Sequence, residues 1–448
     1  MGLSLKRTAG AAAASAALFA SAGAVASPAA AVDGRENRVL VVMLDFQDRA
    51  HPGPAAVKAD FATRYFGADN SLKSYYDHVS RGRIDYVPAV PEKVIGPFKL
   101  PMNGVGCDAG GIRLKTLELL KSKGLNQGED YDSLSMALPR LGCSWAGLGT
   151  IGGPVTWIQA SKGTANPPVV VHEFGHNLGY PHQPGLVCRD GDLTDCEDGP
   201  GGKSPMGAFT AKLGLTATQL IHSGWLTASE HQRVTDSGTF TLRPLYGEQD
   251  GLRALEVPFG QDKLVLEYRR PEGGLDEALG GVYSYRVTGD AYRGGRPLRV
   301  GANNGDGAVT RLTDTAHKLT ISVITTDAAG ARVEISMNGT AVPASASPAT
   351  PVEPASPGPD TDTPLTHGDH EPPADDDGTT AQDGTNPGTP SAAADGGAHP
   401  ADAEDAGTHL AATGGNATAT VLTMAGASLL LLLGVFMLRG GYSKRSRR

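Results

Sequence analysis

Hydrophobic and polar residues follow two kinds of pattern in the first half of the chain. Residues 38–46 are almost wholly apolar and rich in β-branched side chains, which predicts a strand buried on both faces. Residues 84–90 form a second strand-like run. Apolar residues recur at helical spacing in three segments: residues 55–66, 71–79 and 112–123. This alternation of strands and helices predicts an α/β layer with a twisted mixed sheet.

The pattern changes after residue 225 to short apolar runs separated by Gly, Asp and Pro. These runs have the length of strands and fall at residues 239–245, 254–257, 263–268, 282–287, 319–325 and 332–337. We therefore expect a first folded domain at residues 27–230 and a smaller all-β domain at residues 231–340.

The first 26 residues have the pattern of a secretory signal peptide. Lys6 and Arg7 precede an Ala-rich apolar run, and Ala-Val-Ala stands at residues 24–26. The alternative, a membrane-spanning helix, would need a longer apolar run with less Ala and Gly. We expect residues 1–26 to be removed on export.

Residues 410–448 combine a pentapeptide, an apolar run and a basic tail. Leu-Ala-Ala-Thr-Gly at residues 410–414 precedes an apolar run at residues 421–438, which is long enough to span a bilayer. This order resembles the sorting signal of Gram-positive surface proteins, in the LAxTG form that class E sortases read. The resemblance implies cleavage between Thr413 and Gly414 by sortase and attachment of Thr413 to peptidoglycan. A plain membrane anchor is the alternative.

Residues 341–409 consist mainly of Pro, Ala, Asp, Thr and Gly, without Lys or Arg. Such a composition cannot offset the entropy of ordering the backbone, so it predicts a disordered acidic stalk. The whole chain of 448 residues has a formal net charge of -9, and this stalk alone contributes about -13 to that sum. An acidic chain is not expected to bind nucleic acid as its main role.

The chain contains 4 cysteines, all in the first predicted domain: Cys107, Cys143, Cys188 and Cys196. An even number in an exported chain predicts two disulfides, for which the sequence alone allows three pairings. Proximity favours Cys188 with Cys196, which leaves Cys107 with Cys143. A zinc cluster of four thiolates is the alternative, although no C-x-x-C pair supports it.

The motif that carries chemistry is HEFGHNLGYPH at residues 172–182. Asn166 and the prolines after it predict a helix start, with an amide cap. His172 and His176 then lie one turn apart on one face of that helix, where two imidazoles can hold one zinc ion at ~2.0–2.1 Å. Glu173 is placed to reach an attacking water rather than the metal.

The residues after the helix complete a catalytic pattern. Gly179 can adopt the left-handed conformation that ends a helix, and the turn lets His182 return as a third ligand. Three protein ligands leave a fourth position open, as in catalytic zinc sites. Gly175 inside the helix costs about 1 kcal/mol relative to Ala, which a purely structural helix need not tolerate. The alternative is an apolar helix that happens to carry surface histidines.

This extended motif resembles the metzincin metallopeptidases, in which a methionine turn lies beneath the zinc. Ser-Pro-Met-Gly at residues 204–207 offers Met206 for that turn, and Ala208 stands where some metzincins have a tyrosine ligand. Further segments narrow the resemblance to the gametolysin family: residues 39–48, 71–76, 80–82 and 143–149. The resemblance covers about residues 37–225 and implies a zinc endopeptidase acting on extracellular proteins or glycoproteins. No propeptide is visible that would keep such an enzyme latent.

Two other segments, a glycine-rich motif and an acidic loop, give weaker indications of a binding site. Residues 147–152 match G-x-G-x-x-G, but a dinucleotide site needs a helix to follow, and residues 153–157 predict strand or loop. In metzincins a strand at this place pairs with extended substrate, so we expect Gly149 to let a peptide approach closely. An acidic loop could bind calcium through its carboxylates, and the alternative is that these carboxylates are simply solvated. The loop contains Asp190, Asp192, Asp195, Glu197 and Asp198.

Taken together, these patterns predict a zinc endopeptidase with a metzincin-like α/β catalytic domain, secreted and anchored to the cell wall. If the C-terminal apolar helix is instead a plain anchor, the catalytic domain lies outside the cell and is held to the membrane by that helix. The rival function is a surface adhesin or binding module that uses a metalloprotease-like fold without turnover.

Overall fold

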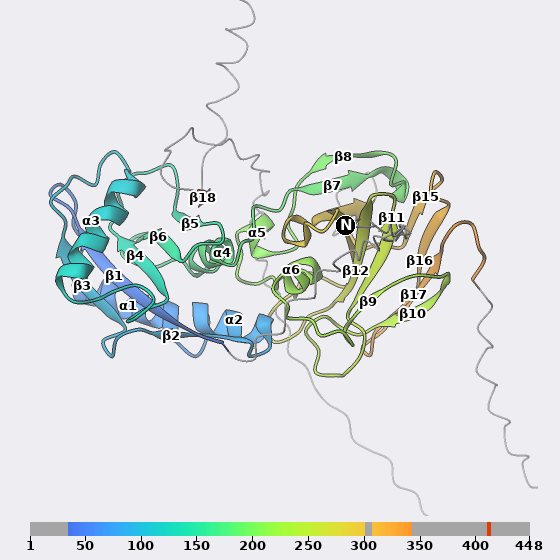
Figure 1. The fold of residues 1–448 in the computed structure, drawn as a ribbon, viewed down its shortest axis with the longest axis horizontal. Helices are drawn as coiled ribbons and strands as arrows, with labels where there is room; N and C mark the ends of the chain where they lie inside the picture. Colours follow the sequence, from blue (N-terminus) through green and yellow to red (C-terminus); the bar gives the residue numbers. More distant parts are fainter. Residues whose placement is uncertain (1–34, 301–306, 343–409, 414–448) are drawn as a thin grey trace, which may run out of the picture.

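The computed structural model describes residues 35–300, 307–342 and 410–413, which form two lobes lying side by side (Figure 1). The N-terminal lobe contains β1–β6, α1–α4 and β18, and the β lobe contains β7–β17. The predicted signal peptide, residues 343–409 of the predicted stalk, Gly414 and the apolar run with its basic tail lie outside the described residues. Within the described part of the chain, no helix has the length and apolar character to cross a membrane.

The N-terminal lobe is built on a seven-stranded sheet in the order β18-β5-β6-β4-β1-β2, with β3 also paired to β1. Its strands are β1 (Arg35–Asp45), β2 (Ile84–Pro88), β3 (Val94–Lys99), β4 (Ser133–Leu138), β5 (Gly147–Thr150), β6 (Val155–Gln159) and β18 (Leu410–Thr413). β1 pairs in parallel with β2, β3 and β4, and β4 pairs in parallel with β6. β5 runs antiparallel to β6, and β18 runs antiparallel to β5. The predicted mixed α/β architecture is confirmed.

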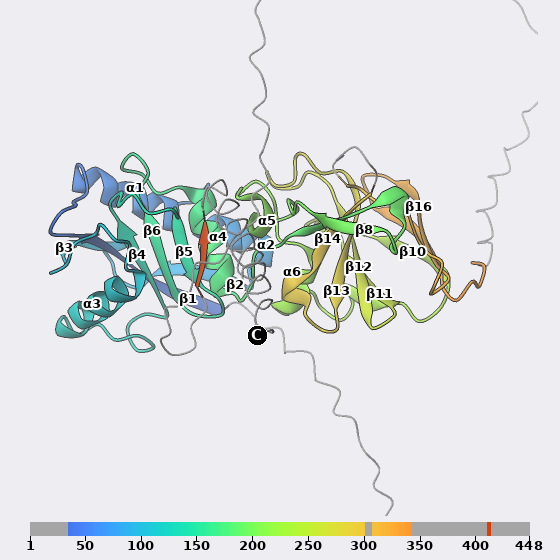
Figure 2. The ribbon, with the colours of Figure 1, turned by 90° about the horizontal axis from the view of Figure 1, so that it is seen from above.

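Helices cover both faces of this sheet (Figure 2). They are α1 (Pro54–Phe66), α2 (Leu72–Ser80), α3 (Ala109–Ser122) and α4 (Pro167–Asn177). Val41 of β1 shares a core with α1, α2 and α4, whereas Val42 on the opposite face shares a core with α3. Both side chains are fully buried. Because each face of β1 is covered, its sequence is apolar throughout instead of alternating.

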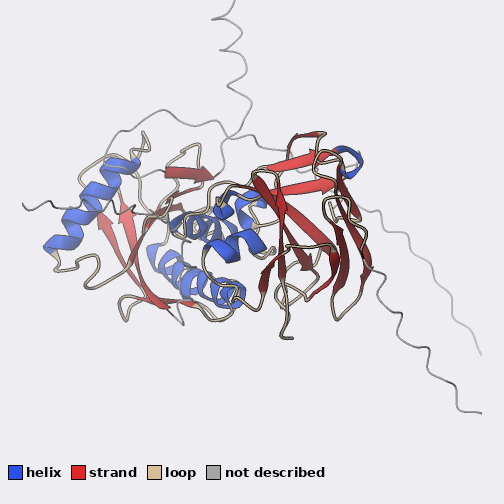
Figure 3. Cartoon of the chain, turned by 45° about the vertical axis from the view of Figure 1, so that its right-hand side comes forward, coloured by secondary structure: helices blue, strands red, loops and turns tan. Residues whose placement is uncertain are grey.

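The β lobe consists almost entirely of strands (Figure 3). One sheet has the order β8-β7-β14-β13-β12-β11-β9 and the other β10-β17-β16-β15. Their bounds are β7 (Gly185–Cys188), β8 (Cys196–Gly199), β9 (His231–Arg233), β10 (Gly238–Leu242), β11 (Ala254–Phe259), β12 (Asp262–Arg269), β13 (Gly281–Thr288), β14 (Arg296–Val300), β15 (Arg311–Asp314), β16 (Leu319–Thr326) and β17 (Ala331–Ser336). A common apolar core joins the two sheets through residues such as Leu266 and Val333.

The border between the lobes differs from the predicted domain boundary at residue 230. β7 and β8 follow closely after the histidine motif, yet they belong to the β lobe, because β7 pairs in parallel with β14 and sets Leu186 opposite Leu298. The chain then returns through the short helices α5 (Pro205–Ala208) and α6 (Ala217–His222), which lie between the lobes. A pairing between segments so far apart leaves no trace in the local pattern, so the sequence does not reveal that residues 185–199 join the sheet of the β lobe.

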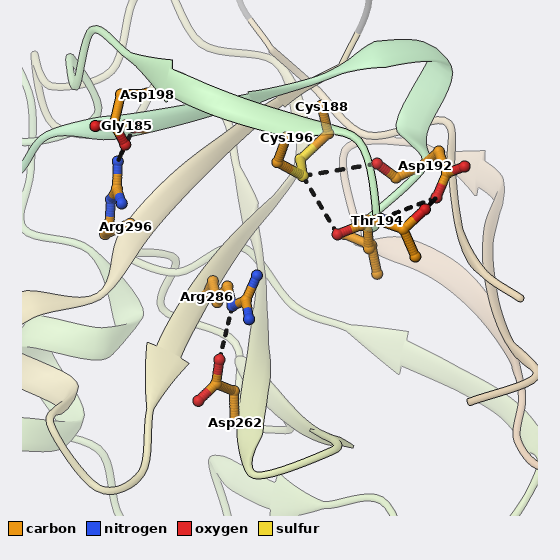
Figure 4. Close-up of a disulfide and its surroundings, with 10 residues drawn as sticks. Gly185, Cys188, Asp192, Thr194, Cys196, Asp198, Asp262, Arg286 and Arg296 are labelled. Carbon is orange, nitrogen blue, oxygen red and sulfur yellow. Dashed lines mark hydrogen bonds and ion pairs between the residues drawn. A yellow bond between two sulfur atoms is a disulfide. The ribbon is translucent and has the colours of Figure 1, made fainter. Parts of the chain in front are cut away.

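Two disulfides join the four cysteines, and no cysteine is free. Cys107 is bonded to Cys143 in the N-terminal lobe. Cys188 is bonded to Cys196 across the β7–β8 hairpin, where the two residues face each other in register (Figure 4). The second disulfide therefore belongs to the β lobe and not to the first domain, and no thiolates remain for a four-cysteine zinc cluster.

An ionic contact connects the lobes at Glu230. Arg81, at the end of α2, places its guanidinium nitrogens 2.5 and 2.7 Å from the two carboxylate oxygens of Glu230. Arg253, just before β11, donates its Nε to the same carboxylate at 2.9 Å. Burial raises the pKa of Glu230, but the hydrogen bonds from Arg81, Thr227 and Arg253 outweigh it and lower that pKa to about 2.

Candidate metal centre

Helix α4 brings the first two histidines of the motif into the middle of the N-terminal lobe. Its residues from Val169 to His176 are all buried, and Tyr76 of α2 donates a hydrogen bond from Oη to the Val171 carbonyl at 2.8 Å. Pro167 occupies the first helical turn, as predicted. The predicted amide cap is wrong, because Asn166 has an extended backbone but its side chain makes no capping hydrogen bond.

Backbone carbonyls orient the two helical histidines. His172 donates from Nδ1 to the Pro205 carbonyl at 2.9 Å, and His176 donates from Nδ1 to the Tyr180 carbonyl at 2.7 Å. A carbonyl oxygen only accepts, so the proton of each neutral ring sits on Nδ1. The lone pair of each Nε2 is therefore available to a metal ion.

The third histidine returns to the first two through the turn at Gly179. Gly179 has a φ of +93° and donates its N–H to the His176 carbonyl at 2.8 Å, which ends the helix as predicted. The Nε2 atoms of His182 and His172 are 3.2 Å apart, and the ligand atoms of all three histidines lie within 4.8 Å of one another.

This geometry fits a metal ion. Two nitrogens at ~2.0–2.1 Å from a tetrahedral ion are separated by about 3.3–3.4 Å, which is close to the distance between His182 and His172. Burial lowers the pKa of His172 well below its usual value, and the neighbouring His176 and His182 lower it further. Burial and His182 lower the pKa of His176 to about 3. Both rings are neutral at pH 7, as metal ligands must be.

Glu173 and strand β5 are packed tightly together. Glu173 is fully buried on α4. A Cβ atom added at Gly147 would lie 2.8 Å from the Glu173 carboxylate, and one at Gly149 would lie 2.5 Å from the Glu173 carbonyl oxygen. The glycines therefore allow β5 to approach α4. The side of Gly149 on which a Cβ would stand faces the helix, so this glycine serves the contact between β5 and α4.

Asn177, the last residue of α4, fixes the other end of this contact. Its Nδ2 donates to the Thr150 carbonyl at 3.0 Å and to the Val155 carbonyl at 3.1 Å. These acceptors lie at the end of β5 and the start of β6. The helix that carries the histidines and the strand beside them are thus held in one position by the motif's own asparagine.

Met206 lies beneath the histidine helix. It is buried in α5, and a Cβ atom added at Gly175 would lie 2.4 Å from its Sδ. Gly175 therefore provides the space that Met206 fills. The same short helix contributes the Pro205 carbonyl that orients His172, so the segment predicted as a methionine turn contacts the site through both side chain and backbone.

Phe209 was not identified from the sequence. Its ring stacks on His172, with ring centroids 4.5 Å apart and an interplanar angle of 20°. Its backbone is left-handed, with a φ of 42°, and 42% of the residue is exposed. An aromatic residue directly after the methionine segment carries no charge pattern that would have marked it, so only the fold reveals its place beside the histidines.

A buried ionic cluster at the end of β12 and in the loop after it positions the segment between α5 and α6. Arg269 pairs with Glu267 and Asp276, and all three side chains are fully buried. Asp276 accepts a hydrogen bond from the Gly214 amide at 2.9 Å, and Glu267 accepts one from the Ala217 amide. Through these contacts the β lobe holds the chain that follows Met206 and Phe209.

The acidic loop predicted as a possible calcium site does not gather its carboxylates. Asp192 accepts hydrogen bonds from the amide and hydroxyl of Thr194, and Asp198 pairs with Arg296 at 2.6 Å (Figure 4). Asp195 pairs with Arg189 at 3.3 Å. Among the residues described, the histidines are the one group of three side chains placed to share an ion.

Among known protein families, one family model matches part of the chain. The model of the gametolysin peptidase M11 family matches residues 116–296, which include the three histidines, Glu173 and Met206. No curated protein matches the chain.

Among solved structures, wild-type OgpA from Akkermansia muciniphila is 12% identical, covering 57% of this chain and 85% of that chain with a TM-score of 0.29. Catalytically inactive OgpA from the same organism, in complex with an O-glycopeptide substrate (glycodrosocin), is 13% identical over the same shares, with a TM-score of 0.28. The family match supports a metallopeptidase of the gametolysin type over the part of the chain that holds the histidines.

Proposed function

We propose that this protein is a zinc-dependent endopeptidase in which His172, His176 and His182 hold the ion. The observation that carries the proposal is the convergence of three imidazoles, two of them with Nδ1 bonded to a carbonyl and Nε2 available. Three imidazole nitrogen ligands with an open fourth position suit catalytic zinc. When bound, zinc would act as a Lewis acid toward the scissile carbonyl and acidify a water.

Glu173 acts as the general base and then the general acid in this proposal. Its carboxylate lies one residue from His172 on the buried face of α4 and beside β5. From there it takes a proton from the attacking water and delivers it to the leaving amine of the cleaved peptide bond. Phe209, stacked on His172 and partly exposed, offers an apolar contact to a substrate side chain beside the site.

The same proposal includes a place outside the cell. The signal-peptide pattern of residues 1–26 and the Leu-Ala-Ala-Thr-Gly segment support export, sorting by sortase and attachment to cell-wall peptidoglycan. Substrates would then be extracellular proteins or glycoproteins. The rival function, an adhesin without turnover, does not require a buried carboxylate beside three converging imidazoles.

The test compares Glu173→Gln with the wild-type chain and with Glu197→Gln, a control in the exposed part of the β7–β8 hairpin. We expect Glu173→Gln to bind zinc in the same proportion and to hydrolyse a denatured protein substrate about 10²- to 10⁴-fold more slowly, because proton transfer is lost. Glu197→Gln should match the wild type. Equal hydrolysis by Glu173→Gln would contradict its role as the base, and a zinc-loaded wild-type chain without hydrolysis would favour the adhesin.

A further inference from the structure

A short segment near the C-terminus completes the sheet beside the candidate site. β18 pairs antiparallel with β5, with Leu410 opposite Thr150, Ala411 opposite Gly149, Ala412 opposite Leu148 and Thr413 opposite Gly147. Figure 2 shows this strand running along β5 next to α4. The paired residues are the first four of the Leu-Ala-Ala-Thr-Gly segment.

The register places one end of β18 at the catalytic carboxylate. Thr413 lies opposite Gly147, where an added Cβ atom would lie 2.8 Å from the Glu173 carboxylate. Ala411 lies opposite Gly149, which abuts the backbone of Glu173 and the Cβ of His176. The segment thus runs along the strand that packs on the proposed base.

Apart from β18, β5 is the edge strand of this sheet. The edge of a sheet exposes backbone N–H and C=O groups, and an extended peptide satisfies them by adding a strand. β5 is also the strand packed directly on the helix that carries Glu173. An extended substrate that brings a peptide bond to Glu173 along this sheet needs the same edge, and two peptides cannot occupy it together.

We propose that Leu410–Thr413 is an autoinhibitory strand that competes with peptide substrates for the edge of β5. This inference rests on the proposed peptidase function and supplies a means of latency for a chain in whose sequence no propeptide is visible. Because the strand belongs to the same chain, dilution does not lower its local concentration. A substrate must displace it, so the apparent KM is raised by the inverse of the fraction of chains with a free edge, while kcat at saturation is unchanged.

The test uses the full chain with the double substitution A411P/A412P. Proline has no N–H and cannot continue a paired strand, so at least one hydrogen bond to β5 is lost whichever residue donates it. The matched control is A392P/A393P, which makes the same change in an alanine pair outside the paired segment. We expect A411P/A412P to lower KM for a peptide substrate by about 3- to 10-fold with kcat unchanged, and A392P/A393P to leave both constants as in the wild type.

A second measurement does not depend on activity. Hydrogen exchange of the β5 amides, residues 147–150, should be slower in the wild type and in A392P/A393P than in A411P/A412P. Faster exchange together with a lower KM supports the proposal. Unchanged exchange, or an unchanged KM in an active enzyme, overturns it. If no variant hydrolyses peptide yet exchange accelerates in A411P/A412P, the peptidase function and the inhibition fail together, while the strand pairing stands.

Discussion

At the scale of single residues, the small side chains of the site are explained by their neighbours. Gly147 and Gly149 let β5 lie on α4, and Gly175 leaves space for Met206. The sequence identified Gly175 as unusual because glycine weakens a helix interior. It could not identify the cause, since Met206 reaches the helix only after the chain has passed through the β7–β8 hairpin.

Gly175→Ala should therefore destabilise the protein although alanine is the better helix former. The added methyl gains about 1 kcal/mol of helix propensity, but it would lie 2.4 Å from Met206 Sδ, and overpacking of a core costs about 1–3 kcal/mol. We expect a net loss of about 1 kcal/mol in the free energy of unfolding, measured in urea, and weaker zinc binding.

The matched control is Gly110→Ala in α3. A Cβ atom there meets only an Asp108 oxygen at 3.6 Å, an ordinary contact, and the residue is exposed. This variant should be as stable as the wild type or more so. If Gly175→Ala behaves in the same way, Met206 does not depend on the missing side chain.

At the scale of helices and strands, elements defined by their own pattern were predicted and elements defined by a distant partner were not. The apolar run of β1, the helical spacing of α1, α2 and α3 and the start of α4 each reflect local burial. β7, β14 and β18 are too short to show alternation, and their positions depend on pairing across the chain. The convergence of the three histidines was predicted because one helix and one turn bring them together. The roles of Phe209 and Arg269 depend on the packing of both lobes, which the sequence does not show.

The two disulfides should contribute unequally to stability. In the chain-entropy description, cross-linking restricts the unfolded chain more when the enclosed loop is longer. Cys107 and Cys143 are separated by 36 residues, and Cys188 and Cys196 by 8. We expect double Cys→Ser variants to lose about 4 and about 2.5 kcal/mol, respectively, in the free energy of unfolding.

Urea unfolding of the two variants, each serving as the control for the other, measures this difference. A larger loss for Cys188 and Cys196 would mean that their disulfide acts in the folded state, by holding the hairpin that follows His182, and would contradict the entropic account.

At the scale of the whole molecule, the contact at Glu230 links stability to pH. Its pKa in the folded state is about 2, below the value of about 4.3 for an unperturbed glutamate. A carboxylate whose pKa is lower in the folded than in the unfolded state stabilises the protein when the pH is above the unfolded-state pKa. This contribution is lost as the pH falls toward the folded-state pKa. We therefore expect up to about 3 kcal/mol to disappear between about pH 4.5 and pH 2.

Glu230→Gln removes this titration, so its free energy of unfolding should fall less steeply with pH in that window than that of the wild type. Urea unfolding at several pH values in the presence of a metal chelator measures the difference without a contribution from bound zinc. Parallel pH profiles for the two proteins would show that Glu230 does not join the lobes through its charge.

The pairing of β7 with β14 also determines when, during synthesis of the chain, the three-histidine site can be completed. The segment after His182 is held from far along the chain: Gln183 donates to the carbonyl of Gly295, 112 residues later, and Leu186 pairs with Leu298. A nascent chain therefore carries its helical histidines long before the strand that supports the third one leaves the ribosome. We expect a growing chain to lack peptidase activity until most of it has been synthesised.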